Sequence, residues 1–313
     1  MRQKFESIFF TLKIIPFGNQ YAKKDFLAKS FFLWSSALGK CFFLDIIGIS
    51  ESDFVTLLQQ TARHYNMTNE RNIYTIIVAA GSGSRFGSDL PKQFCTMNGC
   101  PVLMTTIDHF FKALPYSEII VVVSENMTDL WQRLCREYGF RTSHTIVAGG
   151  ATRFDSVSNA LDYLQNCGKE VRSDNIVLVH DGARPNVSKS LIHRAVESVA
   201  NDVAAIPVVS VTDSIRMKSD DGATSAVDRS RFVAVQTPQA FRAETIFDAY
   251  TKADRSASFT DDASVAEAAG YAVGTFDGDY RNIKITNPAD IVIAELFSKM
   301  IADEENATDE QQK

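Results

Sequence analysis

The stretch "IYTIIVAAGSGSRFGSDLPKQF" (residues 73–94) decides the fold, because a continuous apolar run breaks abruptly into glycine and serine. The run "IYTIIVAA" (73–80) is rich in β-branched residues and does not alternate, which is typical of a strand buried on both faces. Gly81 and Gly83 let the backbone approach a ligand closely, and successive N–H groups there form a concavity that suits an anion. The stretch predicts a buried strand that leads into a phosphate-binding loop.

The loop matches neither of the standard nucleotide-binding motifs. GxGxxG would need its third glycine at position 86, which is Phe86, no acidic residue follows a second strand at the ribose-binding distance, and GxxxxGK[ST] is absent. Two cations follow instead, Arg85 and Lys92, and Pro91 stiffens the approach to Lys92. Two fixed cations beside an amide cradle suit a polyphosphate in transfer, although two solvated surface cations remain the alternative interpretation.

Apolar strands and amphipathic helices alternate through the next hundred residues. This order predicts an α/β fold with a mostly parallel sheet and right-handed crossovers, in which the ligand lies beyond the carboxyl ends of the strands. The expected helices cover residues 101–114, 129–139 and 153–166, and the expected strands cover 118–124, 144–150 and 175–185 with its exit loop.

One segment departs from this alternation. In "PVVSVTDSIRM" (207–217) apolar and polar residues alternate, "SDDGA" (219–223) supplies a turn, and the chain can run back over residues 224–237. The pattern predicts a projecting β-hairpin arm over about residues 207–237. An exposed hairpin with one apolar face indicates a dimerisation arm, and a hairpin folded onto its own domain is the alternative.

Composition excludes some classes of partner and location. The net charge of −6 argues against a nucleic-acid binder, while still allowing a few cations in one cleft to bind a nucleotide. The five cysteines are odd in number and have no CxxC spacing, so we expect reduced thiols in a cytoplasmic protein.

Residues 1–66 differ from the rest, with ten of the 22 phenylalanines. Their most apolar part, residues 30–50, is interrupted by Lys40 and Asp45, which argues against a spanning helix. An interfacial anchor, a small helical appendage and sequence translated upstream of a start at Met67 stay open. We expect an N-terminal extension over 1–66 outside the catalytic fold, a catalytic domain without membrane association over 67–300, and a tail over 301–313.

Six motifs along the chain carry a family resemblance. Together they resemble the 2-C-methyl-D-erythritol 4-phosphate cytidylyltransferases of the non-mevalonate isoprenoid pathway, over about residues 72–300. The resemblance implies a Rossmann-like nucleotidyltransferase fold, a homodimer joined by the arm, and a Mg²⁺-dependent transfer of CMP from CTP to methylerythritol phosphate that releases pyrophosphate. The motifs are "AAGSGSRFGSDLPKQF", "AGGATRFDSV", "VHDGARP", "AVDRSRFVAVQTPQAF", "TDDASV" and "NIKITNPAD".

The resemblance also assigns roles to residues of the nucleotide site. Arg85 and Lys92 match the pair that stabilises the pentacoordinate α-phosphate, as the loop itself suggests. Ala151 stands where bacterial relatives often carry an acidic residue after the two glycines, so this chain departs from the family pattern at that position. The residues implied in CTP binding are Ala79, Ala80, Gly81, Gly83, Gly150, Arg153 and Ser156.

A second set of residues is expected at the sugar phosphate. Asp181 ends a buried strand, where a carboxylate can hold Mg²⁺, and the resemblance places it near the sugar alcohol too. By the same resemblance Ser214, Arg229 and Lys284 bind the sugar phosphate. If the arm exchanges between subunits, Ser214 and Arg229 complete the partner's site. We expect the neighbouring His180 to be structural rather than a base.

Alternatives remain for one motif and for the function. In "TDDASV" (260–265), Thr260 or Asp261 is expected to cap a helix, with ligand contact as the other interpretation. The alternative enzyme is a ribitol 5-phosphate cytidylyltransferase. The alternative from another class is a non-catalytic nucleotide-binding subunit, which would be expected to lose residues such as Asp181 or Lys284.

Overall fold

The computed structural model describes residues 72–81, 90–168 and 174–311. The chain divides into two compact units, one of residues 1–72 with 309–313 and one of Ile73–Thr308, and the second contains nearly all of the described residues. The predicted extension, residues 1–66, lies outside the described residues.

The strand predicted at the start of this unit, β1 (Ile73–Ala79), lies inside the sheet between two parallel neighbours, β4 and β6. The strand order is β10-β7-β11-β6-β1-β4-β5, and β12 pairs with β7. Among the described strands of this main sheet, only β10 and β11 run antiparallel to their neighbours, which confirms the prediction of a mostly parallel sheet. The other strands are β4 (Glu118–Val123), β5 (Thr145–Ala148), β6 (Ile176–Asp181), β7 (Ala204–Ser210), β10 (Val233–Val235), β11 (Gln239–Arg242) and β12 (Gly274–Asp277).

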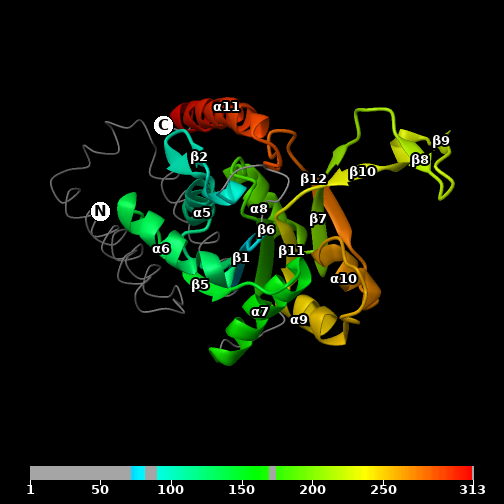
Figure 1. Ribbon diagram of the computed structural model, residues 1–313, viewed down its shortest axis with the longest axis horizontal. Coiled ribbons are helices and arrows are strands. Elements are labelled where there is room, and N and C mark those ends of the chain that lie inside the picture. The colour runs from blue at the N-terminus through cyan, green and yellow to red at the C-terminus, as the bar shows by residue number, and fades with distance from the viewer. Residues whose placement is uncertain (1–71, 82–89, 169–173, 312–313) are drawn as a thin grey trace, which may run out of the picture. The chain divides into compact units, whose positions relative to one another are not determined.

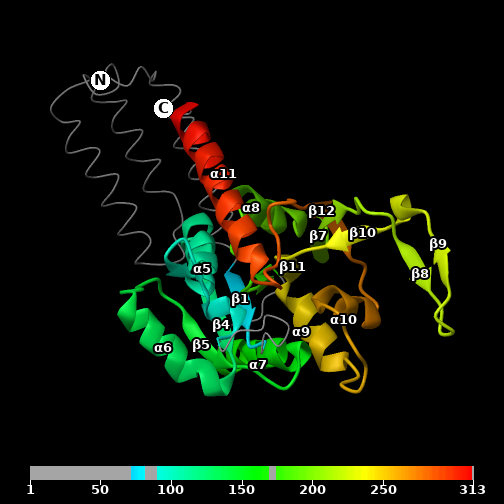
Figure 2. The ribbon, with the colours of Figure 1, turned by 45° about the horizontal axis from the view of Figure 1, so that its top comes forward.

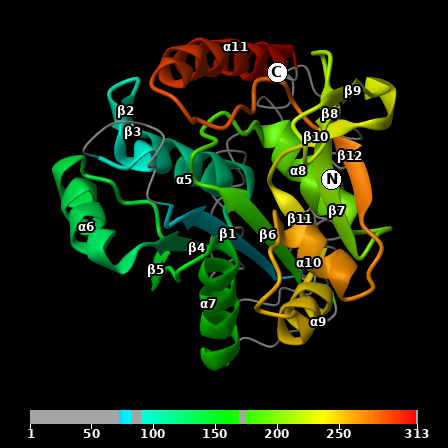
Figure 3. The same cartoon turned by 45° about the vertical axis from the view of Figure 1, so that its right-hand side comes forward.

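Two layers of helices cover the sheet (Figure 3). Helices α5, α6 and α8 pack on one face, and α7, α9 and α10 pack on the other. Along β1, Ile77 faces the first layer and Ile76 the second, and both are fully buried because successive strand residues point to opposite faces. The helices are α5 (Val102–Ala113), α6 (Thr128–Glu137, after the 3-10 turn η2 at Glu125–Met127), α7 (Arg153–Asn166), α8 (Lys189–Ser198), α9 (Ala243–Lys252) and α10 (Asp262–Ala268).

The ends of the predicted helices follow their local sequence. The Thr152 hydroxyl accepts the Asp155 N–H at 3.1 Å, and the Asp155 carboxylate accepts the Thr152 N–H at 3.1 Å, so a capping box starts α7. Gly139, with φ of +60°, follows the end of α6, where a left-handed residue needs glycine. Both helices agree with the sequence-based expectation.

The last helix, α11 (Ala289–Gln311), packs beside the N-terminal ends of α5 and α8 (Figure 2). Its Ala294 is fully buried with Val102 of α5, beside the small hairpin of β2 (Thr96–Met97) and β3 (Cys100–Pro101). Ile301 is also buried, and Glu305 accepts the N–H of Lys189 at 3.2 Å. The predicted domain boundary at residue 300 falls inside this helix.

The arm extends beyond the sheet edge (Figure 1), but it is not one continuous hairpin as predicted. At its base β10 pairs with β7 in the main sheet, and at its tip β8 (Arg216–Lys218) pairs only with β9 (Thr224–Ala226). Residues 211–215 between them form no strand, and on the return the 3-10 turn η3 (Arg229–Arg231) interrupts the ladder. The Arg229 guanidinium donates to the Thr212 carbonyl, so this carbonyl is bound by a side chain instead of by a neighbouring strand.

Among the helices of the described part of the chain, none combines the length and the apolar character needed to cross a membrane. The cytoplasmic location stays a prediction.

Candidate active site

The exit of β1 is fixed by a residue that sequence reasoning missed. Gln93 is buried, and its Nε2 donates to the carbonyls of Ala79 at 2.7 Å and Gly81 at 3.0 Å. Gln93 belongs to the 3-10 turn η1 (Lys92–Phe94), so the bonds tie the segment that carries Lys92 back to the strand end. In the sequence, the signal for this role was that Gln93 directly follows Lys92, a predicted site residue. Arg85 and Gly83 lie outside the described residues.

The loop between β5 and α7 forms the second wall beside this exit. A Cβ added to Gly149 would lie 2.4 Å from the Cβ of Ala80, and one added to Gly150 would lie 2.3 Å from the Cβ of Asp155. Only glycine allows this loop to lie so close to β1 and to the first turn of α7. The loop therefore needs glycine at two positions, as expected for a backbone that approaches a ligand.

Ser156 holds that loop in place. Its hydroxyl accepts the Gly150 N–H at 3.2 Å and donates to the Thr152 carbonyl at 2.9 Å. The residue is only 2% exposed. The structure therefore gives Ser156 a supporting contact with the glycine loop, while its predicted contact with CTP stays a prediction.

Asp181, at the carboxyl end of β6, is the centre of a charged group. Its carboxylate lies 2.9 Å from Lys284 Nζ, 3.4 Å from Arg184 Nε and 3.7 Å from Arg153 Nε. Burial raises the pKa of Asp181, but the charges of Lys284, Arg153 and Arg184 outweigh burial and hold the pKa well below its usual range. The carboxylate is therefore ionised across the physiological pH range.

His180 supports this carboxylate through a chain of hydrogen bonds. The N–H of Asp181 donates to Thr237 Oγ1 at 3.1 Å, and that hydroxyl lies 3.0 Å from His180 Nδ1. His180 Nε2 lies 3.1 Å from the Arg184 carbonyl, which can only accept, so Nε2 carries the proton. Burial lowers the pKa of His180 to about 3. A neutral imidazole with both nitrogens bound has the structural role expected from the sequence.

Two predicted residues lie away from this group. Ser214 and Arg229 are exposed on the arm, where Arg229 binds the carbonyl of Thr212. Within the described residues of one chain, the ion pairs of Asp181 come instead from α7, from the loop after β6 and from Lys284. One chain brings together Ala79, Ala80, Gly81, Gly150, Arg153, Ser156, Asp181 and Lys284 at the carboxyl edge of the sheet, and leaves the two arm residues outside.

The motif "TDDASV" resolves into two roles. Asp261 is the N-cap of α10 and accepts the Ser264 N–H at 2.9 Å, so capping by Asp261 is confirmed. Asp262, which sequence reasoning missed, is buried and binds Arg153. The sequence signal for the role of Asp262 was its position directly after the cap Asp261, at the start of a helix made mostly of small residues.

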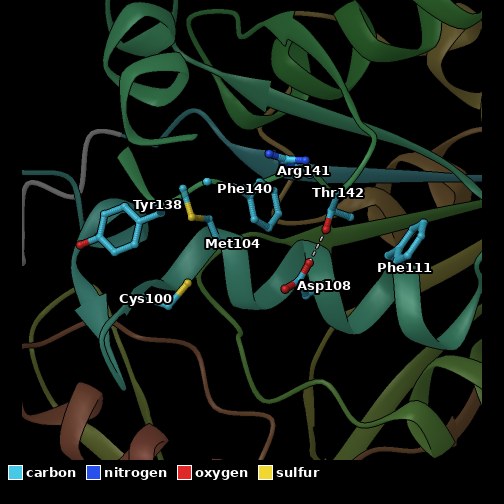
Figure 4. Close-up of a pocket in the computed structure, with 9 residues that line it drawn as sticks. Cys100, Met104, Asp108, Phe111, Tyr138, Phe140, Arg141 and Thr142 are labelled. Atoms are coloured by element: carbon cyan, nitrogen blue, oxygen red, sulfur yellow. Dashed lines mark hydrogen bonds between the residues drawn. The ribbon is translucent and has the colours of Figure 1, made fainter. Parts of the chain in front are cut away.

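A separate open pocket lies between α5 and residues 138–142 (Figure 4). Its volume is about 510 Å³, and its walls include Phe111, Tyr138 and Phe140. The Thr142 hydroxyl donates to Asp108 at 2.5 Å across it. The pocket contains none of the predicted site residues, so the charged group at Asp181 is the better candidate for the active site.

A glycine-lined strand exit, a nearby lysine and an ionised carboxylate at the carboxyl edge of an α/β sheet suit the binding and transfer of a nucleotide's phosphate groups. Fold and site together define a class, the Rossmann-like nucleotidyltransferases.

Comparisons with known proteins identify the family within this class. The sequence profile of 2-C-methyl-D-erythritol 4-phosphate cytidylyltransferase (IspD) matches residues 73–299. The chain is 44% identical over 218 residues to the enzyme of that name from Bacteroides thetaiotaomicron, an alignment that covers 70% of this chain and 95% of the relative. Against that of Clostridium beijerinckii it is 40% identical over 232 residues, covering 73% and 99%.

Solved structures agree with the sequence comparison. The crystal structure of 4-diphosphocytidyl-2C-methyl-D-erythritol synthase from Anaerococcus prevotii is 28% identical, with a TM-score of 0.60, and covers 73% of this chain and 99% of its own. The cytidylyltransferase from Thermus thermophilus is 30% identical, with a TM-score of 0.59 and the same two coverages. The chain belongs to the 2-C-methyl-D-erythritol 4-phosphate cytidylyltransferase family. The predicted family, fold class and enzyme class, and the predicted function in isoprenoid precursor biosynthesis, are confirmed.

Proposed function

We propose that the carboxyl edge at β1 and β6 is where this chain transfers CMP from CTP to the phosphate of 2-C-methyl-D-erythritol 4-phosphate. The observation that supports this most is the buried, ionised Asp181, held by three basic side chains within 4 Å beside the glycine-lined exit of β1. With Asp262, which pairs with Arg153, the group carries two negative and three positive charges, and a site with a positive excess attracts two phosphorylated substrates.

The nucleotide lies against the exit of β1. Its α-phosphate is held by Lys92, which Gln93 fixes beside the strand end, and by Arg85 from the glycine loop. The remaining contacts are assigned by family membership, and the cradle that Gly149 and Gly150 form against Ala80 and Asp155 supports them. The proposed CTP-binding residues are Ala79, Ala80, Gly81, Gly83, Gly150, Arg153 and Ser156.

Asp181 is the residue that would hold Mg²⁺. Magnesium sites for nucleotides use one or two carboxylates together with phosphate oxygens, and an ionised carboxylate at the sheet edge fits that donor set. When bound, the ion would offset the charge of the phosphates and orient them. Lys284, whose Nζ lies 2.9 Å from Asp181 Oδ2, is the basic residue at this edge that would bind the second substrate's phosphate.

The sugar phosphate is proposed to bind Lys284 from the body and Ser214 and Arg229 from the arm. Arg presents a fork to two oxygens and Lys a point charge, a pair that suits a phosphomonoester. Because Ser214 and Arg229 lie on the exposed arm, we assign them to the site of a second copy of the chain. The proposed enzyme is thus a homodimer in which each arm completes the partner's site.

The chemistry needs no general base. A phosphate oxygen of the sugar phosphate is already an anion, and it attacks the α-phosphorus of CTP. The bond from that phosphorus to the bridging oxygen of the β-phosphate breaks, and pyrophosphate leaves with its electron pair. Arg85 and Lys92 stabilise the charge on the five-coordinate phosphorus, so positioning and electrostatics supply the catalysis.

The test uses the full chain with CTP and Mg²⁺, offers methylerythritol 4-phosphate or ribitol 5-phosphate, and follows pyrophosphate release. Release with methylerythritol phosphate alone is the expected result. Release with ribitol phosphate alone would contradict the proposed substrate. A chain that begins at Met67, measured in parallel, shows whether residues 1–66 contribute to activity.

A further inference from the structure

Asp262 is a buried carboxylate that lies beside the proposed site and pairs with Arg153. Its side chain is fully buried and forms a two-pronged pair with Arg153, with Nη1 at 2.8 Å from Oδ1 and Nη2 at 2.7 Å from Oδ2. The Tyr250 hydroxyl donates to the same Oδ1 at 2.7 Å. Three donors thus converge on one carboxylate.

We propose that Asp262 is a positioning residue for nucleotide transfer. It holds the Arg153 guanidinium by both Nη atoms, so that only Nε faces Asp181 and Oδ1 of Asp181 stays available to Mg²⁺, while Lys284 and Arg184 contact Oδ2. The inference rests on the proposed function, in which Arg153 binds CTP and Asp181 holds the ion.

The pairing with Asp262 fixes the orientation of the Arg153 guanidinium. With both Nη atoms bound to Asp262, the Nε of Arg153 lies 3.7 Å from Asp181 Oδ1, beyond hydrogen-bond distance. A guanidinium prefers to bind a carboxylate with two parallel hydrogen bonds. Without Asp262, the nearest carboxylate for Arg153 is Asp181, and a paired contact there would cover Oδ1, which is proposed to hold Mg²⁺.

Local packing fixes the tyrosine that completes the clamp. The Tyr250 ring stacks on Phe154 at 4.7 Å between centroids and 11° between planes. Phe154 directly follows Arg153 in α7, so the stack and the ion pair link the same turn of α7 to α9 and α10. Burial and the neighbouring Asp262 raise the pKa of Tyr250 well above its usual value, so its hydroxyl stays a donor.

The backbone of Asp262 is fixed just as firmly. Gln239 of β11 accepts the N–H groups of Asp262 at 3.1 Å and Ala263 at 3.0 Å, and its Nε2 donates to Asp261 at 2.8 Å. The start of α10 is thereby bonded to the sheet. Asp262 can hold Arg153 in one orientation because its own position is set by β11.

Charge balance predicts the effect of losing this carboxylate. Among the described residues, Arg153, Arg184 and Lys284 lie within 4 Å of Asp181, and Asp262 offsets one of the three positive charges. In Asp262→Asn the three cations share Asp181 alone. Arg153 then turns onto Asp181, where it competes with the metal, and it is drawn away from CTP.

The test measures Asp262→Asn for binding and for kinetics. We expect the Kd of Mg²⁺-CTP in titration calorimetry, the KM for CTP and the Mg²⁺ concentration at half-maximal rate each to rise at least about 10-fold. The KM for methylerythritol phosphate should change less than about twofold. If Asp262 has only a structural role, the variant should yield less folded protein, but the KM values for CTP and methylerythritol phosphate should not change by different factors.

Three further variants decide between the outcomes. Asp262→Glu keeps the charge and should restore at least part of the CTP affinity, and Tyr250→Phe, which leaves the ion pair, should shift the KM for CTP in the same direction by a smaller factor. These two carry the test if Asp262→Asn does not fold. In an Arg153→Met background, Asp262→Asn should have no further effect on the KM for CTP.

Two results would overturn the inference. If Asp262→Asn changes CTP binding equally with and without Arg153, the carboxylate does not act through the arginine. If Arg153→Met leaves CTP binding unchanged, then neither residue serves the nucleotide. If the unmutated chain does not transfer CMP to methylerythritol phosphate, the proposed function is refuted instead. Failure of the inference and failure of the proposed function are therefore distinguishable.

Discussion

The Asp181 group and the arm are both assigned to the sugar phosphate, yet they differ in how they are supported. Asp181 is 8% exposed, and hydrogen bonds fix its backbone and its neighbours. Every residue of β8, β9 and β10 is exposed, and Met217 and Val233 are more than half exposed. One chain therefore builds the sheet edge by itself, whereas the apolar surface of the arm is left uncovered by the described residues of that chain.

The largest effect is expected from Asp181→Asn, at the centre of the preformed region. The amide removes the proposed metal ligand and leaves Lys284, Arg184 and Arg153 without their shared carboxylate. We expect a loss of about 10²- to 10³-fold in kcat/KM, measured by pyrophosphate release. Activity within about fivefold of the unmutated chain would contradict the assignment of Asp181.

A smaller loss is expected from removing one phosphate contact on each region. Lys284→Ala and Arg229→Ala should each raise the KM for methylerythritol phosphate about 10- to 100-fold, because each loses one charged hydrogen bond, and should change the KM for CTP far less. Steady-state kinetics with both substrates measures the difference. Arg231→Ala is the matched control, since it removes an exposed arginine from the same turn η3. Equal losses for both substrates would refute the phosphate role.

Mixing the two variants tests whether the regions belong to different chains. If each arm serves the partner, a dimer of one Lys284→Ala chain and one Arg229→Ala chain has one intact site and one doubly damaged site. Random mixing then restores about a quarter of the unmutated activity. A mixture no more active than its components would show that both residues serve the same chain.

The sheet edge should also make folding stability depend on pH, through its buried histidine. Below pH 6.5 the unfolded chain protonates its histidines, while buried His180 stays neutral down to about pH 3, so folding stability falls as pH decreases. Between pH 6.5 and 4.5 we expect a loss of about 2–3 kcal/mol, measured by urea unfolding. Burial also lowers the pKa of His144, which adds a loss of the same sign.

The control for this prediction is His180→Asn, which should be less stable at pH 6.5 but should lose most of the slope. Asp181, with its low pKa, adds to the loss of stability only below about pH 4, because there the unfolded carboxyl takes up a proton while the folded one stays ionised. An unchanged slope in the variant would assign the pH dependence to other groups.

The smallest effect is expected at the surface of the arm. Phe232→Ser removes a half-exposed ring, so the stability of the single chain should change by less than about 0.5 kcal/mol. The proposed dimer should nevertheless dissociate at a higher protein concentration, measured by sedimentation velocity. A monomer in the unmutated chain at the same concentration would remove the basis for the arm exchange.

The sequence predicted the elements whose signals are local. The apolar run at 73–80 and the stripe at 153–166 gave β1 and α7 almost to the residue, because burial on both faces and the capping box leave clear patterns. Asp181 was found because it ends a buried strand, and the carboxyl edge of a parallel sheet is where ligands bind.

The contacts that sequence missed join residues far apart in the chain. Arg153 and Asp262 are separated by 109 positions, and no local pattern states that they form a pair. Gln93 reads as an ordinary polar residue until its amide is seen bonded to Ala79. The arm was predicted as one hairpin because alternation continues through residues 211–215, where the pairing in fact stops.

The segment through which the arm rejoins the main sheet, residues 233–237, has a consequence for protein engineering. Gln236 donates its N–H to the Pro207 carbonyl at 2.8 Å, and the Thr237 carbonyl accepts from Asn282 at 2.7 Å while its hydroxyl serves Asp181. A shortened enzyme should therefore be cut only at the tip, between residues 216 and 226, where β8 and β9 pair only with each other, so that Ser214 and Arg229 stay in place. A cut that reached residues 233–237 would remove support from Asp181, and its effect on assembly could no longer be separated from its effect on chemistry.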